Sequence, residues 1–347
     1  MQAHVDEAEL LPTQTSNNNT ILELIQYRDT EYGKYENLKC ETILKHFKDD
    51  HVNWINHDGL DEATVKKLGK HFGLHRLLVE DILTECQPKV EEFDQHLFVS
   101  MKMLYRIDPG KIIYEPISFV LGRNYLLTFQ EKEGDSFGPF RERIRLALGQ
   151  VRKKGADYLL YRLIDIIVDN YFAILENIGQ QIETTEEEVY NHPTNREFQK
   201  IQNIKKELIF LRKALYPLRD AVSKLNKGES DFIDPANNRY FMDVYDHVVH
   251  LINTLDTYRD LTTGLMDIHI NSVNIRMTEV MKVLAIFSAI FMPLTFIVGI
   301  YGMNFNTEQS IWNMPELNWK YGYPAVLFFM GALTFALIRY FKYKKWM

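Results

Sequence analysis

The chain has 347 residues, 46% of them hydrophobic, and a formal net charge of −7 at pH 7. This negative charge, without a basic stripe carrying interleaved aromatic residues, argues against a nucleic-acid partner. The two cysteines, Cys40 and Cys86, stand alone, so neither a disulfide framework nor a thiolate metal site is expected.

The N-terminal part of the chain begins with a polar run and then mixes short strands with short helices. Residues 1–20 are expected to be poorly ordered and contain no apolar segment typical of a cleavable signal. After them, the pattern predicts an α+β domain with a mixed sheet and helices on its faces. Strands are expected where β-branched and aromatic residues gather, over 51–56, 97–105, 112–121 and 125–130.

Two short helices and one turn complete this predicted domain. Asp61 is a suitable N-cap for a helix that Gly73 should end, and a second helix is expected over about 75–83. Asp108-Pro109-Gly110 is typical of a turn and would join two of the strands into a hairpin.

Long helices are predicted from residue 156 onward. The first should run over 156–191, and Thr194 with Glu197 forms a capping box that opens the second. The second helix should reach about residue 225, with a kink expected at Pro217. A third helix begins near residue 238 and meets no breaker before the apolar segments. It would hold roughly 60 residues and extend about 90 Å at 1.5 Å per residue.

Two apolar segments near the C-terminus predict membrane spans. No residue from Val283 to Ile300 is charged, and a second apolar run covers Tyr323 to Ile338. Each approaches the roughly 20 residues that cross a ~30 Å hydrocarbon core. The predicted organisation is therefore a poorly ordered N-terminus (1–20), an α+β domain (21–155), a helical hairpin (156–235), a stalk helix (236–278), a first transmembrane helix (279–302), an external loop (303–320), a second transmembrane helix (321–339) and a basic tail (340–347).

Basic residues flank the pair of spans on one side. Cytoplasmic ends of membrane spans are enriched in lysine and arginine, so both termini should be cytoplasmic and the link between the spans external. The expected location is the cell (inner) membrane, as a multi-pass protein in the lipid bilayer. The basic residues are Arg276 and Lys282 before the first span, and Arg339, Lys342, Lys344 and Lys345 after the second.

One face of the first span is small or polar, whereas its flanks are bulky and apolar. In lipid, small and hydroxylated residues face other helices or water. The stripe is therefore either a packing seam or the lining of a pore. Asn304 would lie at its end, where Tyr301-Gly302-Met303-Asn304 closes the helix. The stripe positions, at alternating gaps of four and three, are Met281, Ala285, Ser288, Met292, Thr295 and Gly299.

The motif Tyr301-Gly302-Met303-Asn304, followed by Met314-Pro315-Glu316-Leu317 and a second span, resembles the CorA family of magnesium and cobalt channels. The resemblance extends from about residue 50 to the end of the chain. Further blocks resemble the family in the family's order: Trp54-Ile55-Asn56, Val79-Glu80-Asp81-Ile82-Leu83, Pro88-Lys89-Val90-Glu91, the segment 156–161 and Asp243-Val244-Tyr245-Asp246-His247.

The resemblance implies a homopentameric channel that lets Mg²⁺, and also Co²⁺, enter down the electrochemical gradient. The first span would line the conduit and the second would lie outside it. Gly302, Met303 and Asn304 would bind the hydrated cation at the external mouth. The remaining lining residues would be Met281, Leu284 and Met292 as a narrow apolar constriction. Thr295 and Gly299 would be lower-barrier polar positions, and Ser288 would be a further lining residue.

The resemblance also implies that cytoplasmic Mg²⁺ closes the channel at acidic sites between subunits. Emptied of metal, facing carboxylates would repel each other and loosen the stalk. Mg²⁺ would thus be both transported and regulatory, with no organic cofactor. The matching acids are Glu80, Asp81 and Asp243, with Asp165 less clear and Asp246 and His247 weaker still. The alternative for Glu80 and Asp81 is an ordinary solvated helix end.

Two other functions stay open on the sequence alone. One is zinc transport of the ZntB type, although the intact Gly302-Met303-Asn304 favours magnesium or cobalt. The other is a non-conducting, membrane-tethered sensor or scaffold, which would have no need for Ser288 and Thr295 on one face of a span. No nucleophile–base pairing, phosphate-binding glycine loop or nucleotide motif is present, so the chain is not expected to be an enzyme.

Overall fold

The computed structural model describes residues 21–36, 39–107, 111–132, 134–191, 194–227, 230–304, 306, 310 and 312–346. The predicted poorly ordered N-terminus (1–20) and the predicted turn Asp108-Pro109-Gly110 lie outside these ranges. The chain divides into two units, and each is described by itself. The first comprises Met1–Glu186 and Gln199–Gly264, and the second comprises Glu187–Phe198 and Leu265–Met347.

A seven-stranded sheet with the order β2-β1-β3-β7-β6-β5-β4 forms the centre of the first unit. β3 and β7 run parallel, and every other neighbouring pair is antiparallel, so the mixed sheet is confirmed. The strands are β1 (Ile21–Tyr27), β2 (Tyr32–Tyr35), β3 (Val52–Asp58), β4 (Lys89–Phe93), β5 (His96–Ile107), β6 (Lys111–Leu121) and β7 (Tyr125–Gln130).

The sequence predicted β3, β5, β6 and β7 but not β1, β2 or β4. β1 is buried on both faces, so it lacks the alternation of apolar and polar residues that marks a half-buried strand. β2 has only four residues, and β4 reads Lys-Val-Glu-Glu-Phe, which is too charged to be recognised locally. Pairing with neighbouring strands, rather than local propensity, makes these segments extended.

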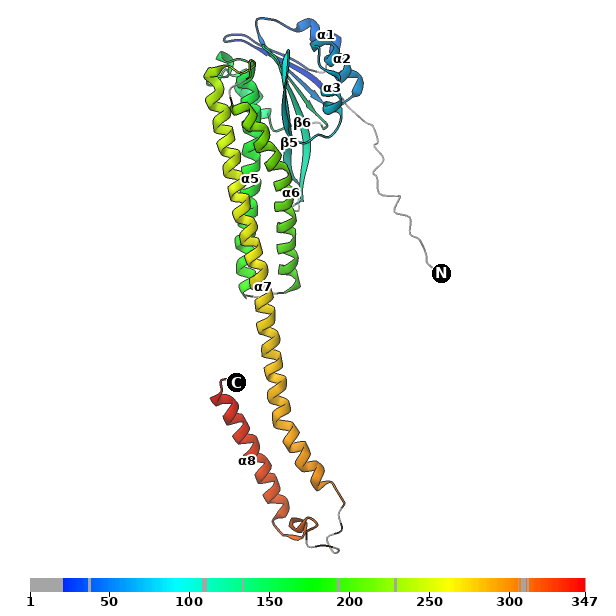
Figure 1. The fold of residues 1–347 in the computed structure, drawn as a ribbon, viewed down its shortest axis with the longest axis vertical. Helices are drawn as coiled ribbons and strands as arrows, with labels where there is room; N and C mark the ends of the chain where they lie inside the picture. Colours follow the sequence, from blue (N-terminus) through cyan, green and yellow to red (C-terminus); the bar gives the residue numbers. More distant parts are fainter. Residues whose placement is uncertain are drawn as a thin grey trace, which may run out of the picture. The chain divides into compact units, whose positions relative to one another are not determined.

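Three short helices cover one face of the sheet: α1 (Cys40–His46), α2 (Glu62–Phe72) and α3 (Arg76–Leu83), shown in Figure 1. Their apolar sides join the sheet in one core that includes Ile43, Leu68 and Leu78. The caps of α2 are as predicted. Asp61 accepts a hydrogen bond from the Ala63 amide at 2.9 Å, and Gly73 ends the helix with a φ of 68°.

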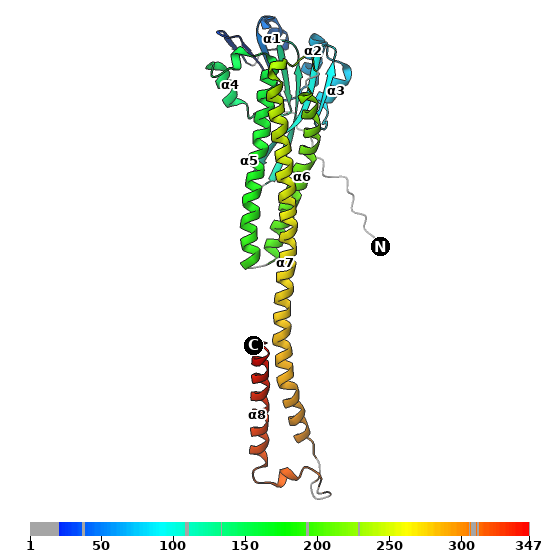
Figure 2. The ribbon, with the colours of Figure 1, turned by 60° about the vertical axis from the view of Figure 1, so that its left-hand side comes forward.

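The opposite face of the sheet meets one further short helix and three long helices, and the long ones run side by side in Figure 2. Trp54 of β3 is fully buried there, with ring centroids 6.2 Å from Phe137 and 6.5 Å from Phe140. The Tyr171 hydroxyl donates to the Lys102 carbonyl of β5 at 2.5 Å. The helices are α4 (Gly138–Arg145), α5 (Ala156–Asn191), α6 (Asn195–Asn226) and α7 (Asn238–Tyr301), with single 3₁₀ turns at Val151–Lys153 and Pro235–Asn237.

The long helices follow the predicted bounds closely. The predicted capping box is present, because the Thr194 amide donates to Glu197 Oε2 at 2.9 Å. Pro217 lies inside α6 and Pro293 inside α7, and neither ends its helix. α7 is a single helix of 64 residues, so it runs without a break through the predicted stalk and the predicted first span.

The start of α5 is tied to the start of α7 through a buried carboxylate. Asp157 Oδ2 accepts hydrogen bonds from the Asp234 amide at 3.0 Å and from Asn237 Nδ2 at 2.7 Å. Lys154 Nζ donates to Oδ1 of the same Asn237 side chain at 3.0 Å. These bonds fix the loop from which the stalk helix begins.

Replacing Asp157 by alanine should destabilise the first unit by about 1–3 kcal/mol, because two donors lose their hydrogen bonds to a buried carboxylate. Thermal unfolding of the purified protein in detergent would show this as a lower midpoint. Asp220→Ala is the matched control, since Asp220 is exposed and pairs only with its neighbour Arg219. Equal midpoints for the two variants would contradict the assigned role of Asp157.

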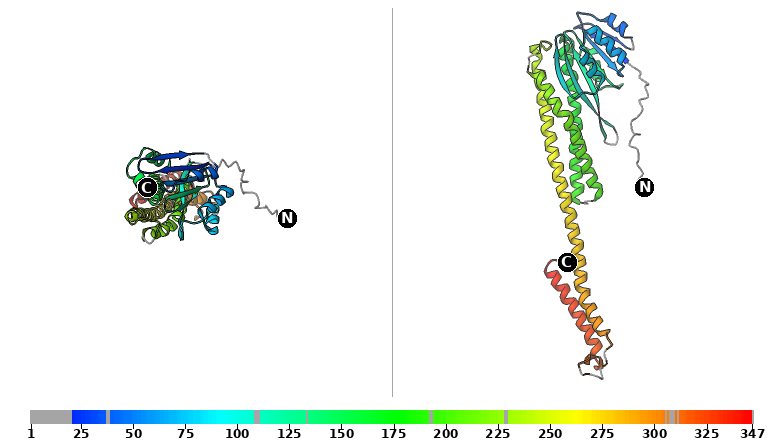
Figure 3. Two further views of the ribbon diagram at one scale, coloured as in Figure 1. Left: turned by 90° about the horizontal axis from the view of Figure 1, so that it is seen from above. Right: turned by 45° about the vertical axis from the view of Figure 1, so that its right-hand side comes forward.

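The second unit contains the end of α7, the 3₁₀ turn Pro315–Asn318 and α8 (Gly322–Tyr343). α8 runs back antiparallel to the last part of α7, as Figure 3 shows. Both helices are long and apolar enough to cross a membrane. α8 continues past residue 339, so the first residues of the predicted basic tail remain helical, which suits lysine and arginine as good helix formers.

Candidate functional site

The predicted stripe on α7 lies on a face that its own chain leaves uncovered. Met281, Leu284 and Met292 are 57%, 64% and 71% exposed, and Ser288, Thr295 and Gly299 are exposed as well. The buried and half-buried positions of the same stretch are Ile286, Ala289, Ile290, Pro293, Leu294 and Ile297.

These two sets of positions occupy opposite sides of the helix. At about 100° per residue, the covered set centres about 180° away from the stripe. α8 is the element that lies beside this part of α7, so the second span does not cover the stripe. A packing seam between the two spans of one chain therefore does not account for the small and polar residues.

The end of α7 places the Gly302-Met303-Asn304 motif in a turn. The Gly302 amide donates to the Val298 carbonyl at 2.9 Å and the Met303 amide donates to the Ile300 carbonyl at 3.1 Å. Asn304 follows outside the helix and is exposed. The motif thus lies at the end of the uncovered stripe, as the sequence predicted.

Glu316 connects this end of α7 to the segment before α8. The Tyr301 hydroxyl donates to Glu316 Oε1 at 2.8 Å. On the other side, Gly322 approaches the Glu316 carbonyl so closely that an added Cβ would lie 2.1 Å from its oxygen. Glu316 belongs to the Met314-Pro315-Glu316-Leu317 block, and its hydrogen bond to Tyr301 depends on a fold of the link that no local pattern indicates.

The predicted regulatory residues fall into two separate groups within one chain. Glu80 and Asp81 lie on α3, whereas Asp165 lies on α5 and Asp243 on α7. In the part of the chain that the structure describes, no three acidic, histidine or cysteine side chains come together as metal ligands. A site built from both groups would need a second copy of the chain.

The predicted regulatory residues on α5 and α7 differ in their exposure to solvent and in their partners. Asp165 is buried and accepts a hydrogen bond from Arg162 Nη1 at 2.6 Å. Burial raises the pKa of Asp165, and the Arg162 charge opposes this shift. Asp243 is 58% exposed, with His247 Nε2 at 3.9 Å from its carboxylate, and Asp246 is exposed. Asp243 is therefore free to meet a cation or another chain, whereas Asp165 already has a basic partner.

On α3, Glu80 is exposed and Asp81 is paired. Lys89 Nζ of β4 lies 2.7 Å from Asp81 Oδ2 and 3.1 Å from Glu91 Oε1. The ammonium group therefore neutralises the predicted ligand Asp81 within the same chain. The sequence placed Lys89 in a family-like block but did not reveal this contact.

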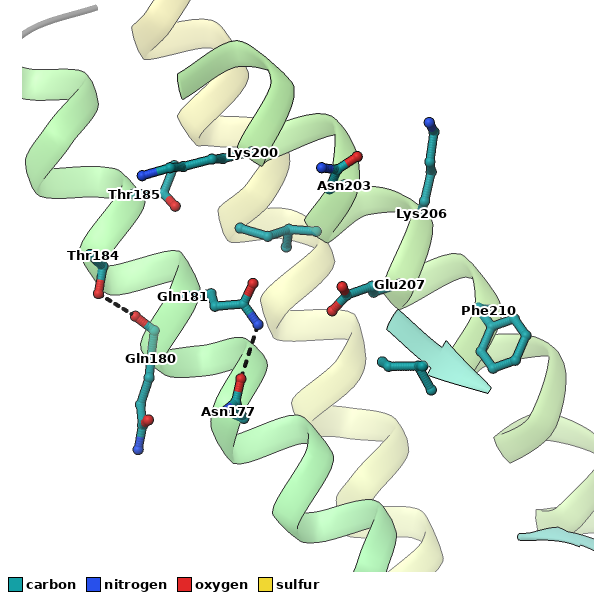
Figure 4. Close-up of a pocket in the computed structure, with 12 residues that line it drawn as sticks. Asn177, Gln180, Gln181, Thr184, Thr185, Lys200, Asn203, Lys206, Glu207 and Phe210 are labelled. Carbon is teal, nitrogen blue, oxygen red and sulfur yellow. Dashed lines mark hydrogen bonds between the residues drawn. The ribbon is translucent and has the colours of Figure 1, made fainter. Parts of the chain in front are cut away.

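A groove of about 820 Å³ between α5 and α6 is separate from all of these residues. Figure 4 shows Gln181 and Glu207 directed into it from the two helices, with Gln181 donating to Asn177 at 3.0 Å. Burial raises the pKa of Glu207, and its Oε2 atom has no hydrogen-bond partner in the structure. None of the predicted site residues lines this groove.

A family model described as "CorA-like Mg2+ transporter protein" matches residues 49–344. The chain belongs to this family. It is 43% identical over 329 residues to the cobalt/magnesium transport protein CorA of Thermotoga maritima, covering 94% of this chain and 92% of that protein. A putative metal ion transporter of Bacillus subtilis is 30% identical, with 91% of this chain and 96% of that protein covered.

The fold of this CorA-like protein also matches solved structures. The complete CorA magnesium transporter structure from Methanocaldococcus jannaschii aligns with a TM-score of 0.76 at 23% identity, covering 93% of this chain and 98% of that one. The α+β domain, the long helix and the pair of spans are thus the architecture of this family. Its members are metal-ion transporters and not enzymes, so the predictions of family and of no enzymatic activity are confirmed.

Proposed function

We propose that the protein forms a homopentameric channel that lets Mg²⁺, and also Co²⁺, flow into the cell down the electrochemical gradient. The observation that carries the proposal is the uncovered stripe of α7, which ends at Asn304 and lies opposite the covered face of the same helix. One pair of spans cannot enclose a pore. Several copies that turn their stripes toward a common axis would cover this face and line a conduit with it.

The chemistry of the stripe suits a hydrated ion. Mg²⁺ gives up its octahedral waters reluctantly and prefers oxygen ligands. No carboxylate occurs between Glu279 and Asn304, so this stretch offers no group that would strip and trap the ion. A ring formed by Gly302, Met303 and Asn304 would instead accept hydrogen bonds from the ion's waters. Apolar rings at Met281, Leu284 and Met292 would close the conduit by dewetting.

The membrane potential would drive entry. A unit charge gains about 2.3 kcal/mol per 100 mV, and a divalent ion about twice that. The basic residues that flank the spans favour cytoplasmic termini in the cell (inner) membrane. The soluble first unit would then be exposed to the cytoplasmic ion concentration, which is where a feedback sensor belongs.

Closure would depend on cytoplasmic Mg²⁺ held between subunits. Glu80 and Asp243 are exposed on separate elements, so these carboxylates would meet across an interface between copies. Bound ions would bridge them, and loss of the ions would leave like charges that repel. Asp81 lies next to Glu80 on α3 and would join it at this interface. Asp165, Asp246 and His247 would contribute to the electrostatic field around Asp243.

The test is ion influx into proteoliposomes that contain the purified protein and a magnesium-sensitive dye, with the membrane potential and the internal magnesium varied. Influx should follow the potential and fall as internal magnesium rises. Movement of zinc alone would support the ZntB-type alternative. Absence of any magnesium, cobalt or zinc flux would leave a membrane-tethered scaffold.

The bond between Tyr301 and Glu316 should influence conduction by holding the motif in place. In Tyr301→Phe the ring remains but the hydrogen bond at 2.8 Å is lost, so magnesium influx should fall several-fold while assembly is unchanged. Tyr321→Phe is the matched control, because the Tyr321 ring is exposed and contacts Trp319. Similar influx in both variants would remove the bond from the mechanism.

A further inference from the structure

The ion pair between Lys89 and Asp81 joins β4 to the end of α3 in the first unit. Lys89 Nζ lies 2.7 Å from Asp81 Oδ2 and 3.1 Å from Glu91 Oε1. The Lys89 and Asp81 side chains are only 29% and 25% exposed, so solvent screens this pair less than it screens a fully exposed one. The ammonium group also lies 5.7 Å from the centre of the Phe98 ring.

Lys89 stays charged in this position. A lysine side chain is ordinarily protonated at neutral pH, and the two carboxylates within 3.1 Å of its Nζ favour the charged form. A permanent cation therefore occupies the Asp81 carboxylate at neutral pH.

The charges around Asp81 come from α3 and β4. Glu80 and Asp81 belong to α3, and Lys89 and Glu91 belong to β4. Lys89 Nζ contacts two carboxylates, those of Asp81 and Glu91, so the three side chains together carry a net negative charge, which attracts a divalent cation. A divalent ion that uses Asp81 must nevertheless displace the ammonium or bind beside it, and both cost affinity because like charges repel.

We propose that Lys89 is an internal counter-ion that competes with cytoplasmic Mg²⁺ for Asp81 and thereby sets the Mg²⁺ concentration at which the channel closes. This inference rests on the proposed regulatory role of the acids on α3. A tethered ammonium has a fixed effective concentration next to its partner, so it would weaken the site without abolishing it. Closure would then occur at higher cytoplasmic Mg²⁺ than the carboxylates alone would give.

The proposal predicts an order within a charge series at one position. Removing the charge in Lys89→Gln should lower the internal Mg²⁺ at half-maximal closure by about three- to tenfold, which corresponds to about 0.7–1.4 kcal/mol of lost competition. Lys89→Glu should lower it further, because a third carboxylate is added beside Asp81 and Glu91. Lys89→Arg should keep the wild-type midpoint or raise it, because a guanidinium can pair with a carboxylate through two hydrogen bonds.

The experiment is magnesium influx into proteoliposomes at a fixed potential, with internal Mg²⁺ titrated for each variant of the full-length protein. Lys67→Gln is the matched control, because Lys67 of α2 forms an exposed ion pair with Glu41 of α1, away from Asp81. This substitution should leave the closure midpoint unchanged. The effect of Lys89→Gln should also shrink as the internal salt is raised, since added ions screen the competing charge. Loss of packing at β4 would not produce the ordered series or this salt dependence.

An Asp81→Asn variant separates failure of this inference from failure of the proposed function. If Asp81→Asn raises the closure midpoint but the Lys89 series is flat or disordered, the competition is overturned and Asp81 remains a sensor. If Asp81→Asn leaves the midpoint unchanged, the acid is not a sensor and the inference about Lys89 falls with it. Absence of magnesium influx in the unmodified protein would overturn the proposed function itself.

Discussion

Replacing Asn304 by alanine is expected to abolish magnesium influx while leaving the assembled protein intact. Asn304 is exposed at the end of the stripe, after the turn in which the Gly302 amide donates to Val298. Its amide would provide neutral hydrogen-bonding groups for the waters of an incoming ion. Alanine offers none of these groups, and every copy in a pentamer would lose its amide at once.

The measurement is potential-driven magnesium influx into proteoliposomes, with the oligomeric state checked by size-exclusion chromatography in detergent. Asn253→Ala is a matched control, because Asn253 is an exposed amide on the same helix in the soluble first unit. It should conduct normally. Near-normal influx through Asn304→Ala would remove Asn304 from the mechanism, whereas loss of the oligomer would assign it a role in assembly instead.

Replacing Asp243 by lysine should shift channel closure to at least severalfold higher internal magnesium. Asp243 is 58% exposed near the start of α7, the helix that continues without a break into the first span. A lysine there replaces an attractive charge with a repulsive one, which weakens any divalent cation held between this residue and a second copy. The stalk would then open at ion concentrations that close the unmodified protein.

Internal magnesium titrations of influx would measure this shift. Asp260→Lys is a suitable control, because Asp260 is 74% exposed on the same helix and pairs with its neighbour Arg259. The same change of charge at Asp260 should leave the closure midpoint in place. An unchanged midpoint for Asp243→Lys would contradict the sensor assignment without affecting the conduit.

The regular parts of this protein could be predicted because their signals are local. A helix is recognised from a continuous stretch without breakers and from its caps, so α5 and α7 were predicted almost to the residue. The spans follow from apolar length alone, and the stripe from its spacing along one helix. The motif at Asn304 was found for the same reason, since it lies directly after one of these helices.

Contacts between distant segments carry no such local signal. β1 and β4 are strands because β3 and β5 lie next to them, not because of their own composition. Arg162 pairs with Asp165 and Lys89 pairs with Asp81. These contacts decide which of the predicted acids remain available to bind a cation.

The sequence by itself therefore determined the family, the long helices, the two spans and the residues on one face of the first span. Only the tertiary structure decided that the second span leaves this face uncovered, as it also leaves flanking residues such as Phe287 and Phe296. It also decided that the predicted regulatory acids lie in two groups with different partners. The physical reason is the range of the interactions. Helix periodicity and apolar length are properties of consecutive residues, whereas burial and ion pairing depend on which segments the fold brings together.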